Sequence, residues 1–370
     1  MKIAIDIGTT NIEGVLCDNN SIICNVGEAN RLSQFGLDVM TRVNKSIDGN
    51  ADIMCSVLRN QLNDIVSSLI SKAAFCTTNG VDTKDPNPDS IDIACNTAMT
   101  YILMNYDCSN LCSFPFSPVH TDIIHTDTVS LELTAAPLLH SDKANETING
   151  TGIPVNICPG LSAFIGGDIV SGLYSLPFEN DNNILFVDMG TNAEMVYITK
   201  DYAYITSAAA GPAFETCGPG MATEIVSALA AMLDNKIIDN TGLLRDEFFE
   251  AGYDYRSIHI SQKKIRDIQM AKSAIRTGID IILNNNTPDK MIISGSFGEN
   301  LSYEDAVKIG LIPNIGKEKI VFAGNTSLKG AVLGFDFGKL PPLINSKNIE
   351  EIYLANHKDF NDCFIANMNF

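Results

Sequence analysis

The hydrophobic pattern of the chain contains one short unit twice, at residues 3–16 (IAIDIGTTNIEGVL) and at residues 184–198 (ILFVDMGTNAEMVYI). In each copy an apolar strand ends at an aspartate, Asp6 or Asp188, and a Gly-Thr turn leads into a second apolar strand. This pattern predicts a β-hairpin with a carboxylate and several backbone N–H groups at its tip, where a metal-bound phosphate fits. Two such hairpins predict two similar lobes that close on a nucleotide.

Elsewhere the pattern separates helices from strands. Apolar residues recur at helical spacing in residues 58–73 and 264–283, which predicts amphipathic helices there. Residues 91–103 have the pattern of a buried strand that turns into a helix at Asn96. The other expected elements are helices in 30–43 and 222–236, short strands and loops in 104–157, and a strand in 291–301 that ends in Gly-Ser-Phe-Gly.

Two segments rich in Ala, Ser and Gly are predicted to pair the lobes, because small side chains let a helix approach its neighbour closely. Residues 158–175 are expected to form a helix that crosses between the lobes. Residues 322–334 are expected to mirror it with a strand, a turn at Gly324 and Asn325, and a second helix. The predicted organisation is a first lobe at 1–165, a second lobe at 166–335 and a C-terminal tail at 336–370.

Length and charge limit the function classes. The 370 residues suit two lobes of roughly 150 to 200 residues each. The formal charge of −19 and the lack of a basic stripe argue against a nucleic-acid partner. Since no segment approaches the ~20 consecutive apolar residues of a membrane span and the first residues read as a strand, we expect no membrane association and a cytoplasmic location.

The ten cysteines are scattered and contain no CxxC pair. We therefore expect free, mostly buried thiols, and no disulfide framework or iron–sulfur cluster in this chain. The five histidines show no metal-ligand spacing, and no P-loop or Ser-His-Asp pattern is present.

Asp6 and Asp188 are the candidate metal-binding and catalytic residues. Each carboxylate closes an apolar strand, a place suited to holding Mg²⁺ through water or to orienting the attacking water. The alternative is that each aspartate only caps a turn. Two copies, followed in order by the glycine-rich strand end at 294–298, favour the nucleotide interpretation.

The two turns supply the candidate phosphate contacts. Their hydroxyl, amide and backbone N–H groups would donate to phosphate oxygens, although ordinary turn chemistry explains the same residue types. Glu194 follows the second turn as Glu13 follows the first, and each faces either the cleft or solvent. The candidate phosphate contacts are Gly8, Thr9, Thr10, Asn11, Gly190, Thr191 and Asn192.

Two loops of small residues are candidates for contact with the nucleotide. Gly295, Ser296 and Gly298 form a strand end whose small side chains allow adenine or ribose to approach the backbone. Gly211 lies in a glycine- and proline-rich loop at 207–221.

This pair of motifs resembles the actin, sugar-kinase and heat-shock-chaperone superfamily of ATPases. The resemblance implies a two-lobed α/β fold of duplicated ribonuclease-H-like lobes, with ATP and Mg²⁺ in the cleft between them. In the chaperones, a helix at the place of residues 264–283 presents a lysine and an acidic residue to the nucleoside. That implies a nucleoside contact for Lys272, with Gln269 one turn earlier, and the alternative is a lysine that faces solvent.

A narrower resemblance extends from about residue 3 to about residue 334. Several separate motifs follow one another along the chain in the order that the family has. They are DIGTT, FGLDVMTRV, ACNTAM, FIGGDIVSGL, DMGTNAEMVY, AAAGPAFE, IRDIQMAKSAIRTGI, SGSFGENLSYEDAVKIGLIP and AGNTSLKGAVLG. They resemble the ATPase domain of the reductive activators of corrinoid proteins. The resemblance implies an ATPase that promotes reduction of a bound corrinoid protein or methyltransferase from Co(II) to Co(I), and a homodimer by analogy.

The chain departs from the family pattern in two main ways. It lacks the cysteine spacing of the iron–sulfur domain that family members commonly carry, so we expect a separate low-potential electron donor, or loss of the reductive role. AGPAFE also runs almost directly into CGPG, where Pro219 replaces the expected serine, and Cys95 replaces the expected glycine before Asn96.

Two other functions stay open at this point. A small-molecule kinase of the same fold needs a carboxylate as general base, and Asp168 in the crossing helix is the nearest candidate. A chaperone-like regulator would use ATP to gate binding without electron transfer.

Overall fold

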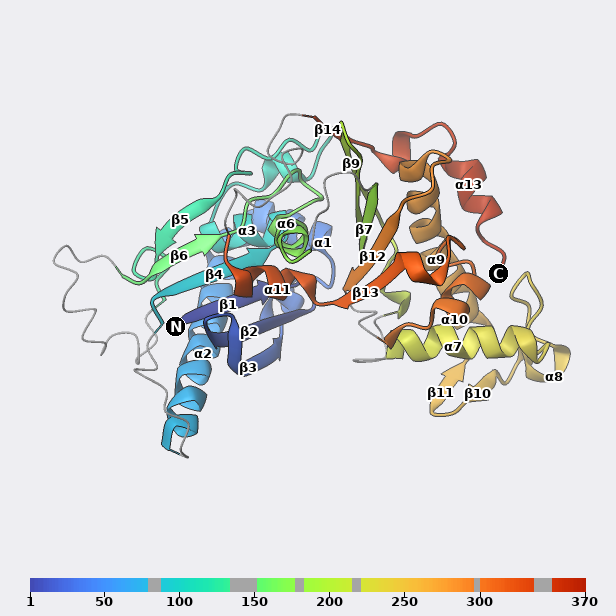
Figure 1. Ribbon diagram of the computed structural model, residues 1–370, viewed down its shortest axis with the longest axis horizontal. Coiled ribbons are helices and arrows are strands. Elements are labelled where there is room, and N and C mark those ends of the chain that lie inside the picture. The colour runs from blue at the N-terminus through green and yellow to red at the C-terminus, as the bar shows by residue number, and fades with distance from the viewer. Residues whose placement is uncertain (79–87, 134–151, 177–182, 215–220, 296–299, 336–347) are drawn as a thin grey trace. The chain divides into compact units, whose positions relative to one another are not determined.

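The structure is a computed structural model that describes residues 1–78, 88–133, 152–176, 183–214, 221–295, 300–335 and 348–370. Contacts between residues divide the chain into two compact units. The first comprises Met1–Leu176 with Thr326–Leu340, and the second comprises Pro177–Asn325 with Pro341–Phe370. Each unit is built on one six-stranded sheet (Figure 1).

The sheet of the first unit has the strand order β3-β2-β1-β4-β6-β5. The first three strands form an antiparallel meander, β4 pairs parallel with β1 and with β6, and β5 is an antiparallel edge strand. The strands are β1 (Lys2–Ile7), β2 (Asn11–Asp18), β3 (Ser21–Ala29), β4 (Ser90–Cys95), β5 (Ile124–Asp127) and β6 (Pro154–Ile157).

Helices pack on both faces of this sheet because its strands are apolar on both sides. Ile3, Ile5 and Ile7 of β1 lie in one core with the apolar stripe of α2, whereas Ala4 lies on the other face with Ala331 of α11. The helices of the unit are α1 (Val39–Lys45), α2 (Ala51–Thr78), α3 (Thr97–Met104), α6 (Gly167–Tyr174) and α11 (Thr326–Leu333). The predicted helix at 58–73 is confirmed within α2.

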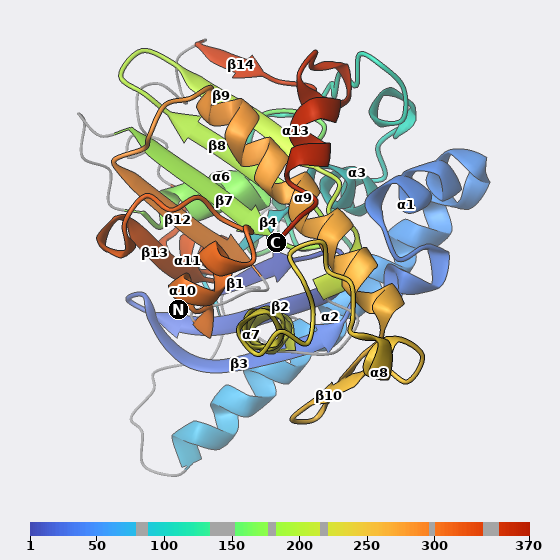
Figure 2. The same ribbon diagram turned by 90° about the vertical axis from the view of Figure 1, so that its right-hand side faces the viewer.

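The sheet of the second unit has the order β13-β12-β7-β8-β9-β14. Its strands are β7 (Ile184–Met189), β8 (Ala193–Ile198), β9 (Ala203–Ala208), β12 (Lys290–Gly295), β13 (Ile320–Gly324) and β14 (Ile349–Glu351), and β10 (Tyr253–Tyr255) pairs with β11 (Ile258–Ile260) in a separate hairpin. Helix α9 lies across the face of the larger sheet with α13 beside it (Figure 2). The helices are α7 (Met221–Asp234), α8 (Asp246–Phe249), α9 (Gln262–Leu283), α10 (Tyr303–Lys308) and α13 (Phe360–Ala366).

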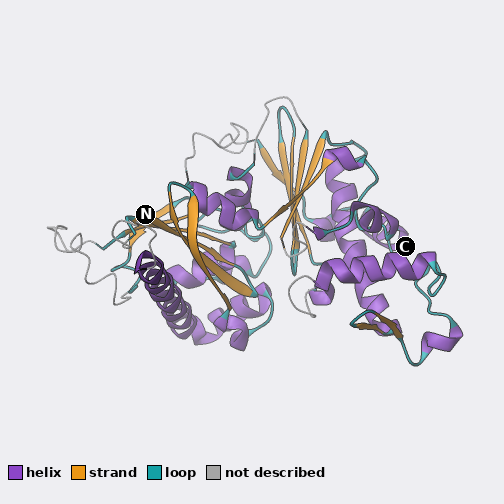
Figure 3. Cartoon of the chain, turned by 60° about the horizontal axis from the view of Figure 1, so that its bottom comes forward, coloured by secondary structure: helices purple, strands orange, loops and turns teal. Residues whose placement is uncertain are grey.

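The duplication predicted from the two Asp-Gly-Thr strands is confirmed by the strand order of the two sheets. Figure 3 shows both sheets, with helices packed against them. The order β9-β8-β7-β12-β13 repeats β3-β2-β1-β4-β6, with the same antiparallel meander followed by parallel strands. A short helix also follows the last strand of each copy, α6 after β6 and α11 after β13. Each half of the chain therefore builds the same α/β motif around its aspartate strand.

Two predicted helices differ from the structure. The segment 158–175 is helical only in α6, because residues 158–166 form a loop that packs against the start of α3. There a Cβ atom on Gly166 would lie 2.5 Å from the Cα atom of Asn96, and Thr97 Oγ1 donates to the carbonyl of Ser162 at 2.7 Å. The segment 30–43 is divided into a 3₁₀ turn (Arg31–Phe35) and α1, whose N-terminus Asp38 caps.

The division by contacts also differs from the predicted lobes. Helices α6 and α11, which the prediction assigned to the second lobe, both belong to the first unit, because α6 packs on α11 and α11 covers β1 and β4. The end of the chain is an integral part of the second unit, because β14 pairs with β9 and α13 packs on α9.

Gly330 permits the close approach of α11 to α6. A Cβ atom at this position would lie 1.8 Å from the carbonyl oxygen of Ser171. Ala normally stabilises a helix interior relative to Gly by up to about 1 kcal/mol. Here we expect Gly330→Ala to lower the free energy of unfolding by about 1–3 kcal/mol instead, because the helices must separate.

Urea unfolding followed by circular dichroism checks this expectation. Gly27→Ala is the matched control, because the nearest atom to its new Cβ would be Glu13 Cγ at 3.9 Å. Equal stability of the Gly330 variant and the wild type would contradict the close-packing interpretation.

Candidate functional site

Asp6 lies at the end of β1 on the face that α11 covers. Its carboxylate is half-buried, and Oδ1 accepts a hydrogen bond from Ser327 Oγ in the first turn of α11 at 2.7 Å. Ser327 is held in turn, because its carbonyl accepts a hydrogen bond from Ser171 Oγ of α6 at 2.6 Å. The paired helices thus fix the orientation of the carboxylate, a support that the sequence pattern did not reveal.

The turn after Asp6 is held by its carbonyl groups. The carbonyl of Gly8 accepts from Asn30 Nδ2 (2.8 Å), that of Thr9 from Arg42 Nη2 (2.7 Å), and that of Thr10 from the Asn30 N–H (2.8 Å). Asn30 and Arg42 are both fully buried. Three successive carbonyls are therefore directed into the protein, while Thr10 and the neighbouring Asn11 are exposed.

The start of α3 fixes the remaining part of the first turn. Asn96 caps α3, since its Oδ1 accepts from the N–H of Met99 at 2.9 Å, and its Nδ2 donates to Thr9 Oγ1 at 3.2 Å. The predicted transition from strand to helix at Asn96 is confirmed, and it also places an amide against the candidate phosphate turn.

Asp188 has a comparable setting at the end of β7. Its Oδ2 accepts from Ser294 Oγ of β12 at 2.7 Å, and the same buried hydroxyl lies 3.1 Å from the carbonyl of Gly324. Gly295 follows in the left-handed region (φ +93°), where a Cβ atom would lie 2.4 Å from the Met189 carbonyl and 2.7 Å from Asp188 Oδ1. Only glycine lets the end of β12 pass so close to this aspartate.

The register of each hairpin places a glutamate opposite the aspartate. Asp6 pairs with Glu13 across β1 and β2, and Asp188 pairs with Glu194 across β7 and β8. Directly opposed residues share a face of the sheet, so each hairpin carries two carboxylates side by side near its tip. Like charges in that position are unfavourable unless a cation or hydrogen-bond donors balance them.

The second turn closes on itself and on a neighbouring loop. The Gly190 N–H donates to the Asn192 carbonyl at 2.8 Å, and the Gly211 N–H donates to the Thr191 carbonyl at 2.8 Å. Gly211 is in the left-handed region (φ +75°), with open space at its Cβ position. The structure therefore brings Gly211 to the second candidate turn.

Gln269 and Lys272 lie on α9, and both side chains are buried. The alternative that Lys272 faces solvent is therefore wrong. Gln269 Nε2 donates to the carbonyls of Thr241 (3.0 Å) and Met368 (2.9 Å). Lys272 Nζ donates to the carbonyl of Asn369 and lies 5.4 Å from the centroid of the Phe370 ring. The side chains for which the resemblance implied a nucleoside contact are thus in contact with residues 368–370. The nucleoside contact stays a prediction.

Apart from Gln269 and Lys272, the candidate residues that the structure describes form one group in each unit. Asp6 and the turn Gly8 to Asn11 lie together in the first unit, and Asp188, Glu194, Gly211 and Gly295 lie together around the turn 190–192 in the second. Ser296 and Gly298 lie outside the described residues.

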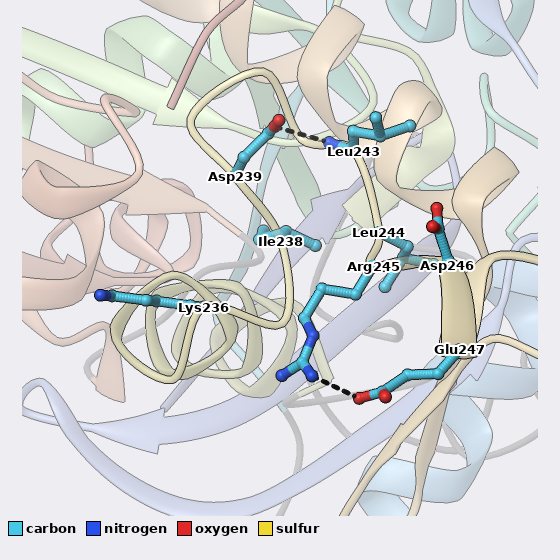
Figure 4. A pocket seen from close by; sticks show the side chains of 8 residues that line it. All are labelled: Lys236, Ile238, Asp239, Leu243, Leu244, Arg245, Asp246 and Glu247. Carbon is cyan, nitrogen blue, oxygen red and sulfur yellow. Dashed lines mark hydrogen bonds and ion pairs between the residues drawn. The ribbon is translucent and has the colours of Figure 1, made fainter.

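A pocket in the second unit contains none of these residues (Figure 4). It is lined by residues of the loop after α7 and of the start of α8, between positions 236 and 247. Arg245 there pairs with Glu247 at 2.9 Å, and Asp239 Oδ1 accepts from the N–H of Leu243 at 3.0 Å. None of the candidate site residues lines the pocket, and we assign it no function.

The two most deeply buried cysteines, Cys95 and Cys158, are poor candidates for chemistry. The eight cysteines whose side chains the structure describes are free thiols. Burial raises the pKa of Cys95 to about 12 and raises that of Cys158, so both stay protonated near neutral pH. Within the described residues, no group of three or more His, Cys, Asp or Glu side chains is arranged to hold a metal ion, and no helix is long and apolar enough to cross a membrane.

Comparison with known families agrees with this geometry. The family model of the RACo middle region matches residues 1–181, and that of the C-terminal domain of RACo, the ASKHA domain, matches residues 182–222 and 216–370. The chain belongs to the RACo family. The actin-like ATPase fold and the resemblance to corrinoid activators predicted above are thereby confirmed.

Two relatives are similar over most of this chain. The corrinoid activation enzyme RamQ of Eubacterium limosum is 25% identical over 399 residues, which cover 90% of this chain and 63% of RamQ. A solved structure of a reductive activator for corrinoid, iron-sulfur protein matches 100% of this chain and 66% of its own length, with a TM-score of 0.78 at 24% identity. The chain therefore spans less than two thirds of either relative, and the structural likeness shows the fold.

Lys272 makes the stability of the second unit depend on pH. Burial lowers the pKa of Lys272 from 10.5 to about 8, and the charge of Arg276 acts in the same direction. Between these two values the unfolded chain binds a proton that the folded chain does not, so the free energy of unfolding rises with pH. Below about pH 8 both states are protonated and this contribution no longer varies with pH.

The difference in unfolding free energy between the wild type and Lys272→Met should therefore shift in favour of the wild type as pH rises from about 8 to about 10. The shift is limited to about 1.4 kcal/mol for each pKa unit. Denaturant titrations at several pH values measure it, with Lys263→Met, an exposed lysine of the same helix, as the control. A difference that does not change with pH would contradict the burial argument.

Proposed function

We propose that this chain is an ATP-dependent activator of a corrinoid protein or corrinoid methyltransferase. ATP binding and hydrolysis would promote reduction of the partner from Co(II) to Co(I) by a separate low-potential electron donor. The observation that carries the proposal is the duplicated hairpin, in which a serine-supported aspartate and a cross-strand glutamate flank a Gly-Thr turn. Membership of the RACo family and the similarity to RamQ support the choice of partner.

The residues of both turns fit a nucleotide with Mg²⁺. Mg²⁺ is held in nucleotide sites by one or two carboxylates together with water and phosphate oxygens, and Asp6 and Asp188 supply carboxylates of this kind. When bound, the ion would neutralise charge on the phosphate oxygens. The cross-strand pairs Asp6–Glu13 and Asp188–Glu194 place a second carboxylate beside each proposed metal ligand.

The turns themselves would receive the phosphates. In the first turn the inward carbonyls leave the opposite side of the peptides for an anion, and Thr10 and Asn11 are exposed there. In the second turn the proposed contacts are Gly190, Thr191 and Asn192, with Gly211 and Gly295 allowing close approach of the ligand. Gln269 and Lys272 would reach the nucleoside only if residues 368–370 moved away from them.

ATP is needed because the reduction is unfavourable. Each ~59 mV of uphill one-electron transfer costs about 1.4 kcal/mol. Binding the partner preferentially in a state that is easier to reduce supplies that free energy through coupling between two sites. We place this activity in the cytoplasm, where ATP is available, and we expect a homodimer by analogy with the family.

Steady-state ATP hydrolysis with and without a corrinoid protein held as Co(II) tests the function. We expect turnover to rise when the Co(II) protein is added and to fall back when Co(I) replaces it, because the coupling requires the state that needs reduction. Absorbance of the corrinoid reports whether Co(I) accumulates when a low-potential donor is present. Turnover that ignores the corrinoid protein, or transfer of phosphate to a sugar, would contradict the proposal and favour a kinase.

Asp188→Asn should abolish ATP hydrolysis and leave the fold intact. The amide keeps an oxygen that accepts from Ser294 but loses the charge that a Mg²⁺-bound phosphate requires. Asp305→Asn is the matched control, because Asp305 also accepts a serine hydroxyl, from Ser227 at 2.6 Å, yet lies on α10 away from the turn. Hydrolysis at the wild-type rate in the Asp188 variant would exclude the metal assignment.

A further inference from the structure

Arg42 on α1 is a fully buried cation behind the first turn. Its guanidinium donates to three neutral acceptors: the carbonyl of Thr9 from Nη2 (2.7 Å), the carbonyl of Gly36 from Nε (2.9 Å), and Met99 Sδ from Nη1 (3.7 Å). In the described part of the chain it makes no ion pair. Asp38 lies near enough to influence it, but both Asp38 oxygens accept from Thr41.

A buried charge without a counter-ion is costly. Moving a cation out of water costs several kcal/mol unless an anion or a set of hydrogen bonds compensates it. Burial accordingly lowers the pKa of Arg42 from 12.5 to about 10, so the side chain is still charged near neutral pH. An arginine in this position is poorly explained by stability alone, because an apolar side chain of similar volume often serves equally well in a core.

The direction of the Thr9 carbonyl indicates where the compensating anion binds. In a trans peptide the C=O and N–H groups point in opposite directions, and among the described residues the only cis bond is Phe114–Pro115. Since the Thr9 carbonyl points to Arg42, the N–H of Thr10 in the same peptide points away from it, toward the outer side of the turn. Hydrogen bonding of the carbonyl also polarises the peptide and strengthens that N–H as a donor.

We propose that Arg42 is a positioning residue for the triphosphate. It holds the Thr9 carbonyl inward and places a fixed positive charge behind the peptide that receives the phosphate. This inference deepens the function proposed above and rests on it. It adds a charged residue that strengthens phosphate binding without touching the nucleotide.

The test compares two ligands that differ in phosphate number. Isothermal titration calorimetry with the β,γ-imido analogue of ATP and with AMP, both with Mg²⁺, gives the two affinities for each variant. We expect Arg42→Gln to lower the affinity for the analogue by about tenfold and the affinity for AMP by about twofold or less. The reason is that the charge acts across the turn on the phosphates that AMP lacks. Arg42→Lys, which keeps the charge, should stay within about threefold of the wild type for the analogue.

Arg59→Gln is the matched control. Arg59 also donates to a backbone carbonyl in the first unit, that of Leu103 at 3.1 Å, but on α2 away from the turn. Its replacement should leave the ratio of the two affinities unchanged. Unfolding midpoints of all variants separate lost binding from lost folding.

The outcomes distinguish this inference from the proposed function. A wild-type chain that does not bind the ATP analogue overturns both. A wild type that binds it, with a folded Arg42→Gln variant that binds as tightly or that loses the analogue and AMP equally, overturns the role of Arg42 alone. If Arg42→Gln does not fold, Arg42→Lys decides, and a loss of more than about tenfold in a folded lysine variant overturns the role of the charge.

Discussion

The two-residue period of an extended strand determines where the chemistry of this chain lies. In β1, Ile3, Ile5 and Ile7 enter the core under α2, so that the alternate position Asp6 must emerge on the opposite face. In β7, Leu185, Val187 and Met189 enter the core of the second unit in the same way, and Asp188 emerges opposite them. A register shift of one residue in either strand would turn the carboxylate into the apolar core and the core side chains to the opposite face.

The same strand period also determines which side chain forms a hydrogen bond with each aspartate. Because Asp6 shares its face with Ala4, the helix that covers Ala4 also presents Ser327 to the carboxylate. Because Asp188 ends a strand with a parallel neighbour, β12 brings Ser294 beside it. In both units a serine hydroxyl donates to the aspartate, but the serine lies on a helix in the first unit and on a strand in the second.

The sequence predicted the repeated hairpin, the long helix at 264–283 and the strand-to-helix transition at Asn96, because each leaves a local periodic or capping signal. It did not predict Ser294, Ser327, Asn30 or Arg42, because these side chains act through contacts with residues 22 to 321 positions away. The extent of the helix at 158–175 was wrong for a similar reason, since packing against α3 replaces helical hydrogen bonds there. Gln269 and Lys272 were proposed from the resemblance to the chaperones, and their contacts with residues 368 and 369 left no local signal.

Because Cys95 is buried, the reactivity of its thiol reports local opening of the first unit. This thiol ends β4 directly before Asn96, the residue that bonds Thr9 of the first turn, and burial keeps it protonated. A thiol that is both inaccessible and protonated reacts with an alkylating reagent only when the surrounding structure opens. The rate of alkylation at Cys95 therefore measures local opening at the junction of β4 and α3, without any label being introduced near the turn.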